Sequence, residues 1–426
     1  MKKDVFLKVA GFGDALTQLL RFAIPIEETE RVSLKDSLDR VISGEVHSPI
    51  NVPHFERSSR DGYAVRSADT FGAGEDKPIF LRLVGEVQIG TQADVTISQG
   101  ECARISTGAM IPERVDSVIM IEYAEEEEGR VKIQRSISPG ENVIRIGSEF
   151  KKGDLIFSRN RKLSSFDTGA LASIGLSEIE VYRKPRVSIM STGNELLEAG
   201  QRIDPGNVYD VNSVTIHHAV TWSGGIPTDL GIFPDDPTRI AKAIRLALES
   251  SEIVLISGGT SKGPGDMMLE VIQSLAKPDF LVHGIAIKPG KPTILASIKG
   301  KLLITLPGYP TSALIVYYTL VDPAVRKMAH RLPYSFERVK ARASVRFYSE
   351  IGRREFKPCR VRNANGGIFL VSPVLTGSEA IATLVDADGF IVIGEDTEFV
   401  SEGEEVEVYI FPHRLEGINP LTGERL

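Results

Sequence analysis

A short loop rich in proline and glycine carries two lysines close together. In the run from Ile287 to Pro292, Lys288 and Lys291 are held by two prolines and a glycine. A lysine on a surface is ordinarily solvated, but two ammonium groups on a stiff loop create a local positive field that attracts anions. The spacing therefore favours an anion-binding role, and a solvated surface turn is the alternative.

Two further loops have the composition of anion sites. Ser257–Asp266 is rich in glycine and precedes an apolar run typical of a helix, and Pro307–Ser312 also leads into an apolar helix. Backbone N–H groups at the start of such a helix are unsatisfied donors that hold anions. In the first loop Lys262 is followed by Gly263, so it is not a P-loop, and it lacks the Gly-x-Gly-x-x-Gly order of a dinucleotide site. Ordinary strand-to-helix turns remain the alternative for both loops.

These loops supply most of the candidate binding residues. Ser312 has a hydroxyl that can donate to an oxyanion, and Pro310 sets the backbone for a first helical turn. The substrate-binding candidates in the two loops are Ser257, Gly258, Gly259, Ser261, Pro307, Gly308 and Pro310.

Acidic side chains are predicted on the same face. Glu195 follows an apolar strand, Asp235 and Asp236 share a turn, and Asp266 ends the glycine-rich loop. Carboxylates repel phosphates unless a hard cation intervenes, and Mg²⁺ takes one or two carboxylates together with phosphate oxygens. Asp236 precedes Pro237 as a helix N-cap would, so we assign the cap to Asp236 and a functional role to Asp235.

Asp210 and Asn212 precede a predicted helix over residues 213–220. Capping the helix explains one of these side chains. Two polar groups at this position could also read the edge of a heterocycle, so both are candidate substrate-binding residues.

The elements that position these residues are strands that alternate with helices. Residues 186–190, 252–256 and 302–306 are apolar and β-prone, and each run breaks at a loop rich in glycine, proline or small polar residues. In an open parallel sheet, ligands bind outside the carboxyl ends of the strands. The three loops are therefore expected to converge on one site of a doubly wound, mostly parallel α/β domain.

The regions on either side of this domain have different residue patterns and predict different secondary structure. A helix is predicted over residues 13–23, and short alternating strands predict a small β-domain from about residue 78 to 144 and another over residues 338–411. The acidic run Glu125–Glu128 between two of these strands is interpreted as a solvated hairpin tip.

Composition excludes several classes of protein. The chain has 426 residues, a formal net charge of −7 and two cysteines, Cys102 and Cys359. A general nucleic-acid binder would be basic, and two distant cysteines make neither a disulfide framework nor a thiolate metal site. The amino terminus lacks a signal-peptide pattern, and the most apolar run, residues 302–321, is divided by Pro307, Gly308 and Pro310, so no membrane span is expected. We expect a cytoplasmic protein.

Six motifs in order resemble the molybdopterin molybdenumtransferase family of the MoeA type, to which the E-domain of gephyrin belongs. The match covers essentially the whole chain. The motifs are Asp61–Val65, Ser106–Ala109, Ser191–Leu196, Ser257–Ser261, Lys288–Pro292 and Leu306–Pro310.

The resemblance implies a multidomain α/β plus β subunit that forms a homodimer. It implies an N-terminal mixed domain (residues 1–46 and 145–180), an inserted β-domain (47–144), a molybdopterin-binding α/β domain (181–330) and a small C-terminal domain resembling a β-barrel (331–426). The implied reaction inserts molybdate, or tungstate, into adenylylated molybdopterin and releases AMP with the help of Mg²⁺. An adenylyltransferase that supplies the substrate is an implied partner.

Residue roles follow from the same resemblance. Lys288, Lys291, Ser312 and Arg353 match oxyanion-binding positions. Glu195, Asp235 and Asp266 match acidic positions around the nucleotide and cation, while Asp61 and Thr107 match residues that reach the partner subunit's cleft. All five are candidate catalytic residues.

The sequence departs from the family at three motif positions. Tyr309 replaces an asparagine, Arg60 a methionine and Asn194 an aspartate, whereas Glu149 stands where aspartate is usual. These changes bear on metal or oxyanion preference.

Two other functions are considered. The first is a molybdopterin adenylyltransferase, because that family has a similar central domain, but the Asp61 and Thr107 motifs argue against it. The second is a non-enzymatic scaffold like gephyrin, and the intact lysine and aspartate positions favour an enzyme. No serine or cysteine resembles an activated nucleophile, so no covalent intermediate is expected.

Overall fold

The computed structural model describes residues 9–258, 267–364, 368–374, 377 and 379–411. The chain divides into two compact units, Met1–Glu30 with Tyr182–Leu426, and Arg31–Val181. It passes between them in β1 (Thr29–Ser33) and β12 (Glu178–Tyr182), which pair with each other. Each unit is described by itself.

The first unit contains a six-stranded sheet in the order β16-β13-β17-β21-β20-β18. The first four strands are parallel, and three of them, β13, β17 and β21, are the strands that the sequence predicted. The sequence did not predict β16, nor the antiparallel edge that β20 and β18 add. The strands are β13 (Arg186–Thr192), β16 (Ile226–Phe233), β17 (Ile253–Gly258), β18 (Phe280–His283), β20 (Ile294–Ile298) and β21 (Lys301–Leu306).

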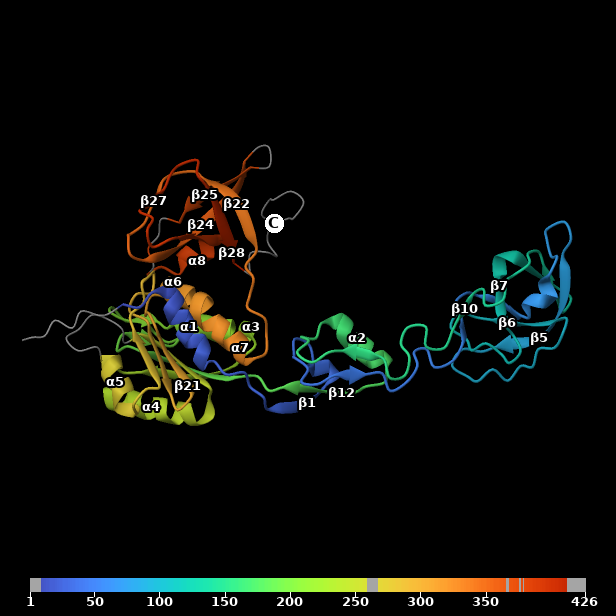
Figure 1. Ribbon diagram of the computed structural model, residues 1–426, viewed down its shortest axis with the longest axis horizontal. Helices are drawn as coiled ribbons and strands as arrows, with labels where there is room; N and C mark the ends of the chain where they lie inside the picture. Colours follow the sequence, from blue (N-terminus) through green and yellow to red (C-terminus); the bar gives the residue numbers. More distant parts are fainter. Residues whose placement is uncertain (1–8, 259–266, 365–367, 375–376, 378, 412–426) are drawn as a thin grey trace, which may run out of the picture. The chain divides into compact units, whose positions relative to one another are not determined.

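Alternate residues of the central strands face two apolar cores. Ile253 and Leu255 of β17 pack with α1, α3, α6 and α7, whereas Val254 and Ile256 pack with α4 and α5. Helices therefore cover both faces of the sheet, as Figure 1 shows. The helices are α1 (Phe12–Phe22), α3 (Val211–Ser223), α4 (Pro237–Ser250), α5 (Met267–Leu275), α6 (Pro310–Val316) and α7 (Asp322–Met328), with a π-helical segment, Tyr317–Val321, between the last two. Short strands β14 (Leu196–Leu197) and β15 (Val208–Tyr209) pair in the connection before α3.

A closed five-stranded barrel follows the α/β domain. Strand β24 pairs with β25, β25 with β22, β22 with β28, β28 with β26, and β26 again with β24. Closure removes the exposed sheet edges that an open sheet of these strands would have. The elements are β22 (Arg338–Ala343), β24 (Arg354–Ala364), β25 (Ile368–Pro373), β26 (Gly389–Ile393), β28 (Glu405–Ile410), helix α8 (Ala382–Asp386), and the pair β23 (Phe347–Tyr348) and β27 (Phe399–Val400).

One strand of the α/β domain joins this barrel. Strand β19 (Ile287–Lys288) pairs in parallel with the start of β24, with Ile287 opposite Arg354 and Lys288 opposite Glu355. The backbone N–H of Arg354 donates to the carbonyl of Ala286 at 2.9 Å. This short pairing brings the lysine loop beside the barrel.

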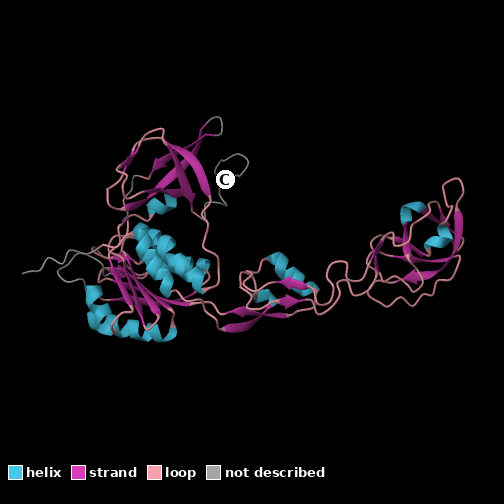
Figure 2. Cartoon of the chain, viewed as in Figure 1, coloured by secondary structure: helices cyan, strands magenta, loops and turns pink. Residues whose placement is uncertain are grey.

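The second unit is built from a six-stranded sheet, β7-β4-β6-β5-β9-β8, and several short pieces (Figure 2). Helix α2 (Ser165–Ser173) begins with a capping box between Ser164 and Asp167. The strands of the sheet are β4 (Gly62–Val65), β5 (Ile79–Val87), β6 (Glu101–Ile105), β7 (Ser117–Met120), β8 (Ala124–Glu127) and β9 (Arg130–Ile133). The remaining pairs are β2 (Val46–His47) with β11 (Leu155–Phe157), and β3 (Arg57–Ser58) with β10 (Val143–Ile144). Single 3₁₀ turns lie at Leu34–Asp36, Ser67–Thr70 and Ile121–Tyr123.

The interpretation of the acidic run as a hairpin tip is wrong for most of its length. Glu125, Glu126 and Glu127 lie in β8 and pair with β9, and only Glu128 is in the turn. Lys132 and Arg104 offset two of the carboxylates, so a charged sequence still forms a solvent-exposed strand.

Candidate active site

The loops predicted to converge leave the same edge of the α/β sheet. Thr192 at the end of β13 lies opposite Gly258 at the end of β17, and Ser257 lies opposite Leu306 at the end of β21. Because these strands are parallel, their carboxyl ends form one edge of the sheet. The three predicted strands therefore end at one edge, and the convergence of their loops on one site stays a prediction.

Asn212 connects three of these segments. Its Nδ2 atom donates to Ser257 Oγ at 2.7 Å and to the backbone carbonyl of Gly308 at 2.8 Å, and the residue is 5% exposed. Its Oδ1 atom is buried without a hydrogen-bond partner in the described part of the chain. The Asn212 amide therefore holds the start of α3, the end of β17 and the Pro307–Pro310 loop together.

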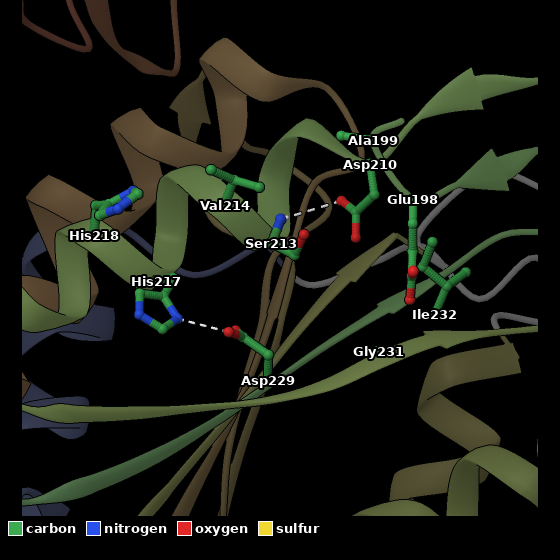
Figure 3. Close-up of a pocket in the computed structure, with 10 residues that line it drawn as sticks. All are labelled: Glu198, Ala199, Asp210, Ser213, Val214, His217, His218, Asp229, Gly231 and Ile232. Carbon is green, nitrogen blue, oxygen red and sulfur yellow. Dashed lines mark hydrogen bonds and ion pairs between the residues drawn. The ribbon is translucent and has the colours of Figure 1, made fainter. Parts of the chain in front are cut away.

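Asp210 is the N-cap of α3 and accepts a hydrogen bond of 3.1 Å from the backbone N–H of Ser213. It also lines a cavity of about 390 Å³ between α3, β16 and the segment after β14 (Figure 3). Across this cavity, His217 Nδ1 lies 2.6 Å from Asp229 Oδ2. The capping alternative thus accounts for Asp210, while Asn212 makes the contacts between loops.

A close backbone approach explains one glycine of the site. Gly258 has φ +93°, and a Cβ atom there would lie 2.2 Å from the carbonyl oxygen of Thr192. Only glycine fits this conformation and this distance without displacing the neighbouring strand. Gly259 and Ser261, the next candidates in the loop, lie outside the described residues, as does Asp266.

The acidic candidates that are described lie on exposed loops. Glu195 follows β13, and Asp235 follows β16, where its backbone N–H donates to Asn194 Oδ1 at 3.2 Å. Asp236 accepts from the backbone N–H groups of Thr238 at 2.8 Å and Arg239 at 3.2 Å, so its assignment as the α4 N-cap is confirmed. No group of three metal-ligating side chains occurs among the described residues, and a magnesium site at Asp235 and Asp266 stays a prediction.

The cationic candidates meet at a carboxylate that the sequence analysis did not select. Lys288 Nζ lies 3.3 Å from Glu350 Oε1, and Arg353 Nη1 lies 3.0 Å from Glu350 Oε2. Lys288, Arg353 and Lys291 together hold the pKa of Glu350 below its usual range, with the hydrogen bond from Lys288 as the largest cause. The fourth candidate, Ser312, is 4% exposed within α6.

A second carboxylate lies beside the first. Lys288 Nζ lies 3.7 Å from Glu355 Oε2, and Lys357 Nζ lies 3.2 Å from Glu355 Oε1. The Glu355 side chain is 6% exposed and belongs to β24, opposite Lys288 in the strand pairing. No local sequence signal pointed to Glu350 or Glu355, because their proximity to Lys288 depends on that distant pairing.

In the second unit the structure brings two candidates together. The backbone N–H of Thr107 donates to Asp61 Oδ1 at 2.8 Å, and both residues are exposed. Strand β4 follows Asp61, and strand β6 precedes Thr107. The two strands pair with Gly62 opposite Ile105. Glu149 forms an exposed ion pair of 3.2 Å with Arg57.

Neither cysteine has the properties of a nucleophile. Burial raises the pKa of the Cys102 thiol to about 12 and also raises that of Cys359, so both thiols are protonated at neutral pH. No helix of the described residues is long and apolar enough to span a membrane.

Three models of known protein families match successive regions of the chain. Family models match in order: the MoeA N-terminal region (domain I and II) over residues 11–175, a probable molybdopterin binding domain over residues 188–327, and the MoeA C-terminal region (domain IV) over residues 340–411.

Relatives and solved structures extend the agreement. The molybdopterin molybdenumtransferase of Haemophilus influenzae is 33% identical over 91% of this chain and 95% of its own length, and that of a Nostoc species is 30% identical over 91% and 89%. A crystal structure of a molybdopterin biosynthesis MoeA protein from Pyrococcus horikoshii, 37% identical, covers 95% of this chain and 99% of its own with a TM-score of 0.80. The chain therefore belongs to the MoeA family of molybdopterin molybdenumtransferases.

Proposed function

We propose that this protein is a molybdopterin molybdenumtransferase. It takes adenylylated molybdopterin and molybdate, or tungstate, transfers the metal to the dithiolene sulfurs and releases AMP. The observation that carries this proposal is a group of three cations beside the sheet edge. The charges of Lys288, Lys291 and Arg353 all act on the carboxylate of Glu350. The family relationship supplies the identity of the substrates.

The site must offset several negative charges that meet there. The substrate is a polyanion, and the metal arrives as a dianionic tetrahedral oxyanion. The ammonium groups of Lys288 and Lys291 and the Arg353 guanidinium would hold the oxyanion, while the loops joined by Asn212 would hold the pterin and phosphates. Placing the oxyanion beside the dithiolene is mainly a gain of proximity.

Asp235 fits a magnesium ligand. Its carboxylate is exposed and forms no ion pair in the described part of the chain, and carboxylate oxygens are the ligands that Mg²⁺ prefers. Asp235 and Asp266 would hold the ion, which would offset the charge of the substrate phosphates when bound. Glu195, on the neighbouring loop after β13, would face the nucleotide.

We also propose a homodimer, in which Asp61 and Thr107 serve the cleft of the partner subunit, and a cytoplasmic location. The hydrogen bond between Thr107 and Asp61 supports a shared role, because it fixes the two exposed residues as one unit. A molybdopterin adenylyltransferase would supply the substrate. No covalent enzyme intermediate is required, since both thiols are buried and protonated.

A direct test is the variant Lys291→Ala. Loss of one ammonium group should weaken molybdate use, seen as lower AMP release and less metal in the recovered molybdopterin. Lys242→Ala, which removes an exposed lysine of α4, is the control. Full metal insertion by Lys291→Ala would remove the oxyanion role, and pyrophosphate release from ATP and molybdopterin would point to an adenylyltransferase.

A further inference from the structure

The loop between β23 and β24 places a carboxylate inside the group of cations that the proposed function assigns to an oxyanion. We propose that Glu350 is a displaceable internal counter-ion: in the free enzyme its carboxylate occupies the cation cluster, and an incoming oxyanion binds by displacing it. This inference rests on the proposed function for the identity of the oxyanion and adds a residue that sets the affinity of its site.

The geometry of Glu350 resembles that of a bound anion. Its two carboxylate oxygens contact different cations, Oε1 facing Lys288 Nζ at 3.3 Å and Oε2 facing Arg353 Nη1 at 3.0 Å. The positive charges of Lys288 and Arg353, with a smaller contribution from Lys291, lower the pKa of this carboxylate. Glu350 is therefore ionised at neutral pH and uses the groups that a tetrahedral oxyanion would need.

Glu350 is also the carboxylate that is able to leave. Its side chain is 54% exposed and belongs to the loop between β23 and β24, whereas the side chain of Glu355 is 6% exposed and fixed in β24. An exposed ion pair gains little net free energy, because water solvates the separated groups well. Withdrawal of Glu350 to solvent thus costs little, while Glu355 remains in place to neutralise part of the cluster.

Competition of this kind lowers the affinity for any free anion. An oxyanion that enters must give up part of its binding free energy to break the contacts of Glu350 with Lys288 and Arg353. Removing the negative charge of Glu350 removes this cost and leaves one more uncompensated positive charge. The variant Glu350→Gln should therefore bind molybdate roughly tenfold more tightly, the sum expected of two exposed ion pairs.

The experiment measures binding of inorganic molybdate to the full-length protein by equilibrium dialysis, with metal analysis of both compartments. The matched control is Glu405→Gln. Glu405 is a barrel carboxylate, 58% exposed, whose Oε1 also lies 3.3 Å from a lysine, Lys340. The control therefore removes the same charge and the same kind of contact away from the cluster.

The expected result is tighter binding by Glu350→Gln, with Glu405→Gln like the wild type and Glu350→Asp close to the wild type. In turnover assays at a constant concentration of adenylylated molybdopterin, Glu350→Gln should lower the KM for molybdate. Equal or weaker binding by Glu350→Gln, the same gain in Glu405→Gln, or no binding by any variant would overturn the inference. Turnover of adenylylated molybdopterin by the wild type tests the proposed function separately, so the two failures are distinguishable.

Discussion

The side chain of Asn212 donates a hydrogen bond of 2.8 Å to the backbone carbonyl of Gly308, 96 residues further along the chain. The same amide nitrogen donates to Ser257, so one buried side chain fixes the spacing of two loops at the sheet edge. Asn212 is thus a positioning residue for the loops that the proposed function assigns to the substrate.

The variant Asn212→Ala should lose about 1–3 kcal/mol of unfolding free energy, because it removes these contacts and leaves the buried hydroxyl of Ser257 without its donor. The KM for adenylylated molybdopterin should rise as the loops lose their spacing. Denaturant unfolding and steady-state kinetics measure the two effects. Asn207→Ala is the control, since Asn207 donates to the carbonyl of Glu195 in a more exposed position. Equal losses in both variants would contradict a special role for Asn212.

The variant Gly258→Ala should be strongly destabilising. An added Cβ would lie 2.2 Å from the carbonyl oxygen of Thr192, so β13 and β17 would have to separate at the site. Gly300→Ala is the matched control, because Gly300 also has positive φ but has open space around the added atom. We expect about 1 kcal/mol for Gly300→Ala and about 3 kcal/mol or more for Gly258→Ala in denaturant unfolding. Similar values would show that conformation alone, without the clash, requires glycine.

Magnesium dependence should distinguish two neighbouring aspartates. Chelation should abolish AMP release, and added Mg²⁺ should restore it. Asp235→Asn should raise the half-maximal Mg²⁺ concentration at least about tenfold, since even outer-shell partners of a metal cost that much. Asp236→Asn should leave it unchanged, because asparagine caps a helix as well as aspartate does. The proposed role of Asp235 fails if the two variants require the same Mg²⁺ concentration.

A buried carboxyl beneath α3 should give stability a pH dependence. Asp322 accepts from Ser223 at 2.6 Å and from Arg326 at 2.7 Å, and Ser223 also contacts the Tyr317 hydroxyl. Burial raises the pKa of Asp322, although Arg326, Ser223 and Arg331 lower it in part. The folded state therefore holds this proton more tightly than the unfolded state. The resulting stabilisation is present below the ordinary aspartate pKa and is lost as pH rises through the raised value.

The variant Asp322→Asn lacks this titration. At low pH it should be less stable than the wild type, because it replaces the protonated carboxyl that the fold favours and alters its contacts with Ser223 and Arg326. The difference in unfolding free energy between the wild type and the variant should shrink as pH rises from about 4 toward neutrality, the direction set by the raised pKa. Denaturant unfolding of both proteins over that pH range measures this difference in unfolding free energy. A difference that grows with pH would mean that ionised Asp322 is the stabilising form.

Much of the architecture could be predicted from local patterns. Alternation of apolar strands with helices identified the parallel core, and Pro237 after Asp236 identified a capped helix start, because these signals depend on neighbouring residues alone. The domain boundaries and the roles of the site residues remain predictions. The acidic run at Glu125–Glu128 was misread because a charged strand is set by its pairing with β9, and composition does not record the pairing.

By itself the sequence determined which loops leave the strands and which of them carry lysines, glycines and acids, since chain order and residue type are local properties. Only the tertiary structure decided that Asn212 joins Ser257 to Gly308 and that Glu350 lies between Lys288 and Arg353. Each of these contacts joins segments far apart in sequence. Their existence depends on strand pairing and close packing, which no short window of sequence contains.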